Sequence, residues 1–119
     1  MAYRDNHQPP WQAESCPTWC RREHLERDHP EDRVHQSAAV EIAGVRGERG
    51  PQPRRKAVPT QLVVWATQHV EDPHTWVRLE DAETGTVALL LTVETASAVS
   101  GALAGLLGQL EASQRQTDH

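Results

Sequence analysis

Hydrophobic and polar residues alternate most clearly between residues 76 and 92. Val77 and Leu79 share one face of the first half, and Leu89 and Leu91 share a face of the second with Val87. A period of two is typical of a strand with one buried face. Because the polar link between the halves ends on a glycine, the pattern predicts an antiparallel β-hairpin.

Two earlier segments also have strand character. Residues 61–70 are rich in β-branched and aromatic side chains, and residues 39–45 alternate around Val40 and Ile42. Together with the hairpin, these segments predict a small antiparallel sheet of three to four strands.

After the hairpin the hydrophobic period changes to three and four, which predicts a helix over residues 93–112 that covers the sheet. Thr92 is placed to cap its first turn. Gly101, Gly105 and Gly108 each cost about 1 kcal/mol of helix propensity against alanine. We therefore expect these glycines to serve close packing, against the sheet or along a dimer seam. The apolar stripe consists of Ala96, Val99, Leu103, Leu106, Leu107 and Leu110.

The chain has only two cysteines, and histidines follow them at ligand spacing. Cys16, Cys20, His24 and His35 form the run Cys-x3-Cys-x3-His-x10-His. Two thiolates and two imidazoles are a ligand set of structural zinc, in which four protein ligands complete the tetrahedron and leave no position for a substrate. The sequence therefore predicts a zinc-stabilised segment rather than a catalytic metal site. A buried apolar cysteine pair and a redox pair are the alternative interpretations.

A short helix beginning at Ser15 would place Cys16, Cys20 and His24 along one face. Trp19, between the two cysteines, is expected to pack over the ligands.

The fourth ligand stays open on spacing alone. His29 lies at a common distance from His24, whereas His35 lies just before the first predicted strand. A turn over residues 28–32 would let the chain swing back and bring His35 to the site.

The same residues resemble a known family. The run CPTWC from Cys16 to Cys20, with His24 and then His35 ahead of the first strand, is similar to small, largely uncharacterised actinobacterial proteins that share a domain of unknown function. The resemblance covers roughly residues 15–110. It implies that His35, rather than His29, completes the ligand set, and it implies no activity.

The predicted fold class is α+β, with a Cys2His2 zinc-bound segment at residues 15–37 ahead of a small antiparallel sheet and a covering helix at residues 38–115. Residues 1–14 are polar and lack a periodic pattern, which predicts a disordered tail. Residues 46–59 combine glycine, proline and arginine, which predicts a flexible basic loop inside the α+β domain.

Charge narrows the partner classes. Residues 1–56 hold ten basic and nine acidic side chains, a net charge of +1, whereas residues 57–119 hold two and eight, a net charge of −6. The acidic sheet and helix would repel the phosphates of a nucleic acid. The basic loop at residues 46–59 is therefore interpreted as a solvated loop rather than as a nucleic-acid contact. The basic residues that could contact nucleic acid are Arg46, Arg49, Arg54, Arg55 and Lys56.

Among the function classes, a zinc-stapled protein-interaction or regulatory module without catalysis fits best. A nucleic-acid-binding zinc protein and a small metalloenzyme are the alternatives, although no Ser-His-Asp set or phosphate-binding loop supports an enzyme. His69 and His74 are interpreted as parts of an exposed turn. The chain has 119 residues with 37% hydrophobic, enough for one modest core, and no signal-like or membrane-length apolar run, so we expect a cytoplasmic protein.

Overall fold

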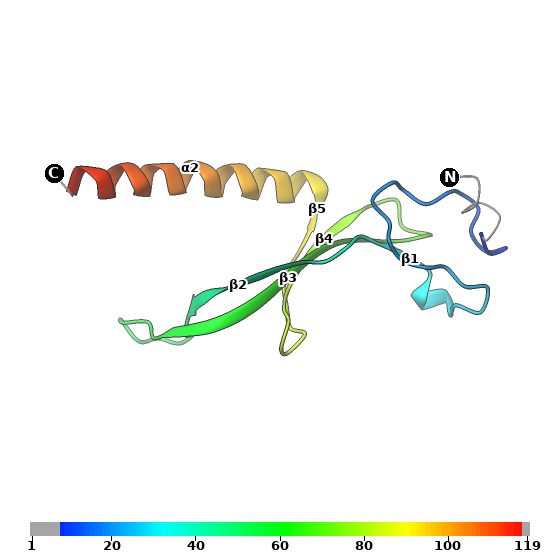
Figure 1. The fold of residues 1–119 in the computed structure, drawn as a ribbon, viewed down its shortest axis with the longest axis horizontal. Helices are drawn as coiled ribbons and strands as arrows, with labels where there is room; N and C mark the ends of the chain where they lie inside the picture. Colours follow the sequence, from blue (N-terminus) through cyan, green and yellow to red (C-terminus); the bar gives the residue numbers. More distant parts are fainter. Residues whose placement is uncertain (1–7, 118–119) are drawn as a thin grey trace.

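A computed structural model gives the fold of residues 8–117. A five-stranded antiparallel sheet lies between an amino-terminal segment of mostly irregular structure and one long carboxyl-terminal helix (Figure 1). The predicted α+β class is confirmed, with five strands where three or four were predicted. The additional strand is short and belongs to the predicted metal segment.

The longest strand, β3 (Ala57–His69), is the central strand of the sheet and pairs with three others. Two strands pair one after the other along one edge of it, β2 (Val40–Gly47) and β1 (Val34–Gln36). On the other edge lie β4 (Trp76–Asp81) and then β5 (Val87–Thr92), which form the predicted hairpin. The register shifts between Leu79 and Glu80, so that Val87 pairs with Glu80. Val87 therefore lies on the opposite face of the sheet from Leu89 and Leu91, whereas the alternation predicted all three on one face.

The predicted basic loop is shorter than its predicted bounds of residues 46–59. β2 continues to Gly47 and β3 begins at Ala57, and the Glu48 amide donates to the Lys56 carbonyl at 2.8 Å. The guanidinium of Arg55 donates to the carbonyl of Glu48 at 3.1 Å and also to that of Gly50. Residues 48–56, which we call the basic tip, therefore form the end of a long hairpin.

The strand register gives the sheet two chemically different faces. One, which we call the apolar sheet face, carries side chains from four strands: Val40, Ile42, Leu62, Val64, Val77, Leu79, Leu89 and Leu91. The other, which we call the tryptophan face, carries Val63, Trp65, Trp76, Arg78 and Glu80. Alternation along each strand separates the two sets.

The helix α2 (Val93–Thr117) begins where the sequence predicted. The Thr95 amide donates to Thr92 Oγ1 at 3.2 Å, which is the expected cap. Among the strands, α2 lies closest to β5 and β4, which immediately precede it. Its leucine stripe, formed by Leu103, Leu106, Leu107 and Leu110, stays half-exposed.

The predicted role of the helix glycines in packing against the sheet is wrong within this chain. No described atom from elsewhere in the chain lies within 4 Å of the position that a Cβ would take on Gly101, Gly105 or Gly108. Close packing of these glycines therefore does not explain how α2 is held in one chain.

Burial is concentrated around the predicted metal ligands. Among residues 8–117, Pro9, Gln12, Cys20 and His35 are buried, and Val63 is the one buried residue of β2 to β5. Within the same residues, no helix combines the length and the apolar character that a membrane crossing requires.

Candidate metal centre

Cys16, Cys20, His24 and His35 come together at one point. One donor atom of each lies within 4.8 Å of the donor atoms of the other three. Cys20 and His35 are buried, and Cys16 and His24 are half-buried. The structure thus brings together the four residues that the sequence selected.

The distances suit a tetrahedral ion. At about 2.3 Å to sulfur and 2.05 Å to nitrogen, a sulfur and a nitrogen on one tetrahedron lie about 3.6 Å apart. Cys20 Sγ and His24 Nε2 are 3.6 Å apart. Two sulfurs on one ion lie about 3.8 Å apart. Since the cluster is nowhere wider than 4.8 Å, shifts of about 1 Å would close it around an ion.

The two cysteines are positioned by a turn, so the predicted helix beginning at Ser15 is wrong. The Cys20 amide donates to the Pro17 carbonyl at 3.0 Å, which closes a turn with Thr18 and Trp19 at its centre. The chain then runs on without helix to His24. A turn followed by an extended segment meets the spacing of four as well as a helix does, because the donor atoms need only converge.

Backbone pairing attaches this segment to the sheet. The Arg21 amide donates to the Gln36 carbonyl at 2.8 Å, at the end of β1. β1 in turn pairs with the end of β3, where His35 lies opposite Gln68. The Ser37 amide then donates to the Ala66 carbonyl at 3.0 Å, and Ser37 Oγ accepts from the Ala66 amide at 2.8 Å. His35 is therefore held by the sheet, while the other three ligands come from the irregular segment.

Residues 8–14, which the sequence assigned to a disordered tail, pack on the metal centre, whereas residues 1–7 of that tail lie outside the described residues. The Gln12 side chain is 7% exposed and donates from Nε2 to Cys16 Sγ at 3.2 Å. Trp11 donates from Nε1 to the Leu25 carbonyl at 2.8 Å, and its ring lies edge-on to His24 with centroids 5.5 Å apart. Neither residue was identified from the sequence.

Aromatic rings surround the histidine ligands. Trp19 lies edge-on to His35 at a centroid distance of 6.4 Å, which agrees with the packing predicted for it. The rings of His24 and His35 are 5.1 Å apart and nearly perpendicular. The guanidinium of Arg33 lies 5.2 Å from the centre of the Trp11 ring. These contacts restrict the orientation of both imidazoles.

His29 has a different role from the four clustered residues. It precedes the short 3-10 helix η1 (Pro30–Asp32), and its Nδ1 accepts from the Glu31 amide at 3.4 Å. Its side chain is exposed. The predicted turn over residues 28–32 is thus present, and it carries the chain from His24 back to β1.

The turn between β3 and β4 contacts the segment that contains η1. His69 Nε2 donates to the Pro30 carbonyl at 2.6 Å, while its Nδ1 accepts from the Glu71 amide at 3.1 Å. Asp72 accepts from the His74 amide and from Trp76 Nε1, both at 2.8 Å. These two donors, the His74 amide first, hold the pKa of the Asp72 carboxyl below its ordinary value. The side chains of His69 and Asp72 thus hold the turn, and His74 lies exposed in it.

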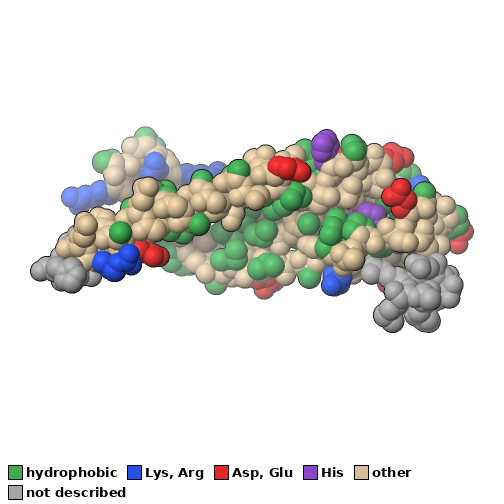
Figure 2. All heavy atoms as spheres, turned by 90° about the horizontal axis from the view of Figure 1, so that it is seen from above, with side chains coloured by type: hydrophobic (Ala, Val, Ile, Leu, Met, Phe, Trp, Pro, Cys, Tyr) green, Lys and Arg blue, Asp and Glu red, His purple; other side chains and the backbone are tan. Residues whose placement is uncertain are grey.

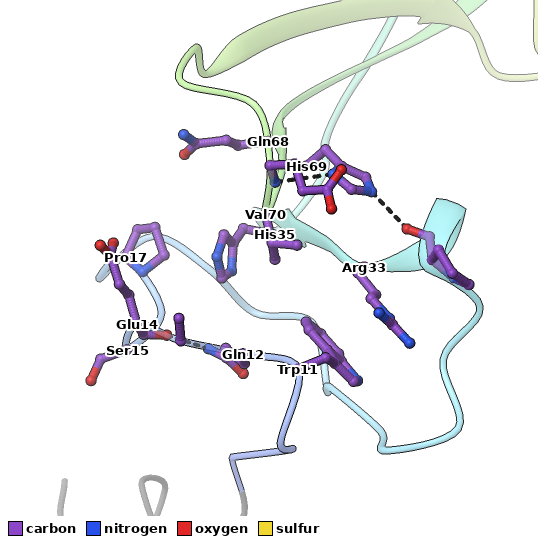
Figure 3. A pocket seen from close by; sticks show the side chains of 13 residues that line it. Trp11, Gln12, Glu14, Ser15, Pro17, Arg33, His35, Gln68, His69 and Val70 are labelled. Atoms are coloured by element: carbon purple, nitrogen blue, oxygen red, sulfur yellow. Dashed lines mark hydrogen bonds between the residues drawn. The ribbon is translucent and has the colours of Figure 1, made fainter.

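A pocket of about 400 Å³ lies beside the centre, between residues 11–17 and the β3–β4 turn. His35 forms part of its wall, and Figure 3 shows the His35 ring between Gln12 on one side and Val70 on the other. Trp11, Arg33 and His69 also line it. One ligand is therefore reached from an open, mixed polar and apolar surface.

A family model described as a domain of unknown function (DUF6907) matches residues 1–119. The chain belongs to this family. The predicted resemblance to a domain of unknown function is thereby confirmed. The DUF6907 match spans the metal segment, the sheet and α2 together. Among curated proteins and among solved structures, no significant match is found.

Proposed function

We propose that this protein is a zinc-stapled interaction module without catalytic activity. The observation that carries the proposal is the convergence of four protein donor atoms at one largely buried point. When four side chains fill a tetrahedral shell, no position is left for a substrate, so the ion has a structural task. Here that task is to join the irregular segment to His35 on β1.

The donor set supports zinc as the ion. Two thiolates and two imidazoles form one of the common structural zinc sites, whereas magnesium and calcium prefer oxygen donors. The hydrogen bond from Gln12 to Cys16 Sγ adds support of the kind that holds metal ligands in place.

Gln12→Ala is expected to weaken zinc binding by about 10- to 100-fold, because ligand-supporting hydrogen bonds contribute on that scale. Competition with a chromophoric chelator measures the zinc affinity directly. Gln61→Ala, which removes a glutamine side chain from β3 outside the centre, is the matched control and should leave the affinity unchanged. Equal affinities for the two variants would contradict the supporting role of Gln12.

The tryptophan face is the surface that best suits a protein partner. Trp65 and Trp76 are half-buried on it, and the Arg78 guanidinium lies 5.6 Å from the centre of the Trp65 ring. Arg78 also forms a 2.9 Å ion pair with Glu80. Tryptophan and arginine are the residues most often responsible for binding energy at interfaces, which supports this face as the contact surface.

Trp76→Ala is expected to weaken capture of the native partner by about 30-fold or more, the effect of losing an interface anchor of about 2 kcal/mol. Neutralising Arg54, Arg55 and Lys56 together should leave capture intact. The basic tip lies at the far end of the β2–β3 hairpin from β1 (Figure 1), whereas Trp76 lies near the end of β3 that pairs with β1. A pull-down from the host measures both variants, and metal content confirms that each is folded. Recovery chiefly of nucleic acid, lost in the triple variant, would favour the nucleic-acid alternative instead.

A further inference from the structure

The chain exposes far more surface than a compact protein of its size. Its accessible area is 9290 Å², whereas a compact monomer of 13.3 kDa exposes about 6,400 Å². An allowance of roughly 1,500 Å², the area of an unfolded peptide of nine residues, is subtracted for the residues outside 8–117. An excess of about 1,400 Å² per chain remains, more than the roughly 800 Å² per partner of a standard interface.

The overall dimensions lead to the same conclusion. The radius of gyration is 19.4 Å, against about 13.5 Å for a compact domain of 119 residues, and the molecule measures 63 × 27 × 22 Å. Apart from Val63, no residue of β2 to β5 is buried. A sheet and a helix of this size normally bury a core between them, and a single chain does not complete one.

The leucine stripe of α2 is one half of the missing core. Leu103, Leu106, Leu107 and Leu110 are 51–54% exposed and follow the helical period. Between residues 95 and 110 the helix has no charged side chain. An uncharged, half-exposed apolar helix is typical of an interface and not of a solvated surface.

The apolar sheet face is the other half. Val40, Ile42 and Leu89 on this face are 60%, 45% and 42% exposed. Figure 2 shows hydrophobic side chains along the helix and over the sheet beside it. The leucine stripe of α2 and the apolar sheet face thus both expose aliphatic side chains.

We infer that the protein is a homodimer in which the leucine stripe of each α2 and the apolar sheet face of each chain form one shared core. Interfaces of permanent homodimers are large and apolar and resemble a domain core divided in two, which is what one chain presents. A two-fold axis between the chains would let the leucine stripe of one chain pack against the leucine stripe or the apolar sheet face of the other.

Charge also favours a second copy as the occupant. Each chain carries a formal charge of −5, so two copies repel one another unless they meet through uncharged surface. Residues 95–110 and the exposed valine, isoleucine and leucine side chains of the apolar sheet face provide such a surface. The tryptophan face lies on the opposite side of the sheet and stays available for the partner proposed above.

Sedimentation velocity and light scattering of the full chain with its metal test the inference. The expected mass is twice 13.3 kDa at micromolar concentration. The double substitution Leu103→Glu with Leu110→Glu should raise the dimer dissociation constant by at least 100-fold, as should Val40→Glu alone, since each places charge in an apolar core. A wild-type chain that stays monomeric from 1 to 100 µM would overturn the inference.

Each substitution has a matched control. Ala98→Glu with Ala112→Glu adds two charges to the same helix, about 80° or more around its axis from every residue of the stripe, and Val45→Glu adds one to the opposite face of the same strand. These variants should remain dimeric. Dissociation by a control as strong as that by its counterpart would place the contact elsewhere and overturn the inference as well. Retention of bound metal shows that a dissociated variant is still folded at the metal centre.

Discussion

Cys20→Ser is expected to lower the zinc content from about one ion per chain to none. A serine hydroxyl does not deprotonate near neutral pH and is a poor zinc ligand, and three ligands hold the ion far more weakly than four. Cys20 is also fully buried, so a water molecule cannot easily take its place. Elemental analysis of protein purified under reducing conditions measures the ratio of zinc to chain.

The two histidines that spacing alone could not separate provide the control. His35→Ala should lose zinc, because His35 is a member of the buried cluster. His29→Ala should retain it, because His29 is exposed, lies outside the cluster and accepts from the Glu31 amide near the start of η1. Retention of a full equivalent by Cys20→Ser, or loss from His29→Ala and not from His35→Ala, would contradict the assigned ligand set.

Removal of the ion by a chelator is expected to release residues 8–37 while β3, β4 and β5 stay paired. Apart from η1 and β1, each of three residues, this segment has no regular structure, so an ion bound by the four clustered residues would supply much of what holds it. Hydrogen exchange of the Arg21 and Ser37 amides, which donate to Gln36 and Ala66, should accelerate by roughly 100-fold or more. Amides between β3 and β4 should change little.

Two results would contradict this expectation. Complete loss of circular dichroism on chelation would show that the sheet cannot persist without the ion. Unchanged exchange at Arg21 would show that backbone pairing alone holds the segment. Restoration of slow exchange by added zinc, and not by magnesium, is the control for the specificity of the ion.

The hairpin and α2 were predictable because each is governed by a regular period. Val77 and Leu79 alternate over the whole of β4, and the stripe of α2 repeats over several turns. β1 has only three residues, and its identity as a strand depends on pairing with residues 67–69 more than thirty positions later. No local pattern encodes such a partner. The extent to which α2 contacts the sheet was likewise not encoded, because a stripe shows that a helix has an apolar side and not what covers it.

The convergence of Cys16, Cys20, His24 and His35 was predictable from residue chemistry, whereas the surroundings of these residues were not. Cysteine and histidine at short spacing suggest a metal whether a helix or a turn presents them, so the wrong helix did not affect the choice of ligands. Gln12 and Trp11 lie in a polar stretch without periodicity, and their contacts with Cys16 and His24 exist only after the chain has folded back. The tryptophan at residue 11, a large side chain within an otherwise polar stretch, was the one available signal.

The length of β3 sets the distance between the two ends of the molecule. At about 3.3 Å per residue, its thirteen residues span about 40 Å from the basic tip to the strand end that holds β1. Mobile ions at physiological concentration screen a charge within about 8 Å. The positive charges of the tip therefore have almost no influence on the electrostatic potential at the four clustered Cys and His residues. The tip is for that reason a suitable position for inserting a fluorophore or an affinity peptide whose chemistry must not disturb the metal centre.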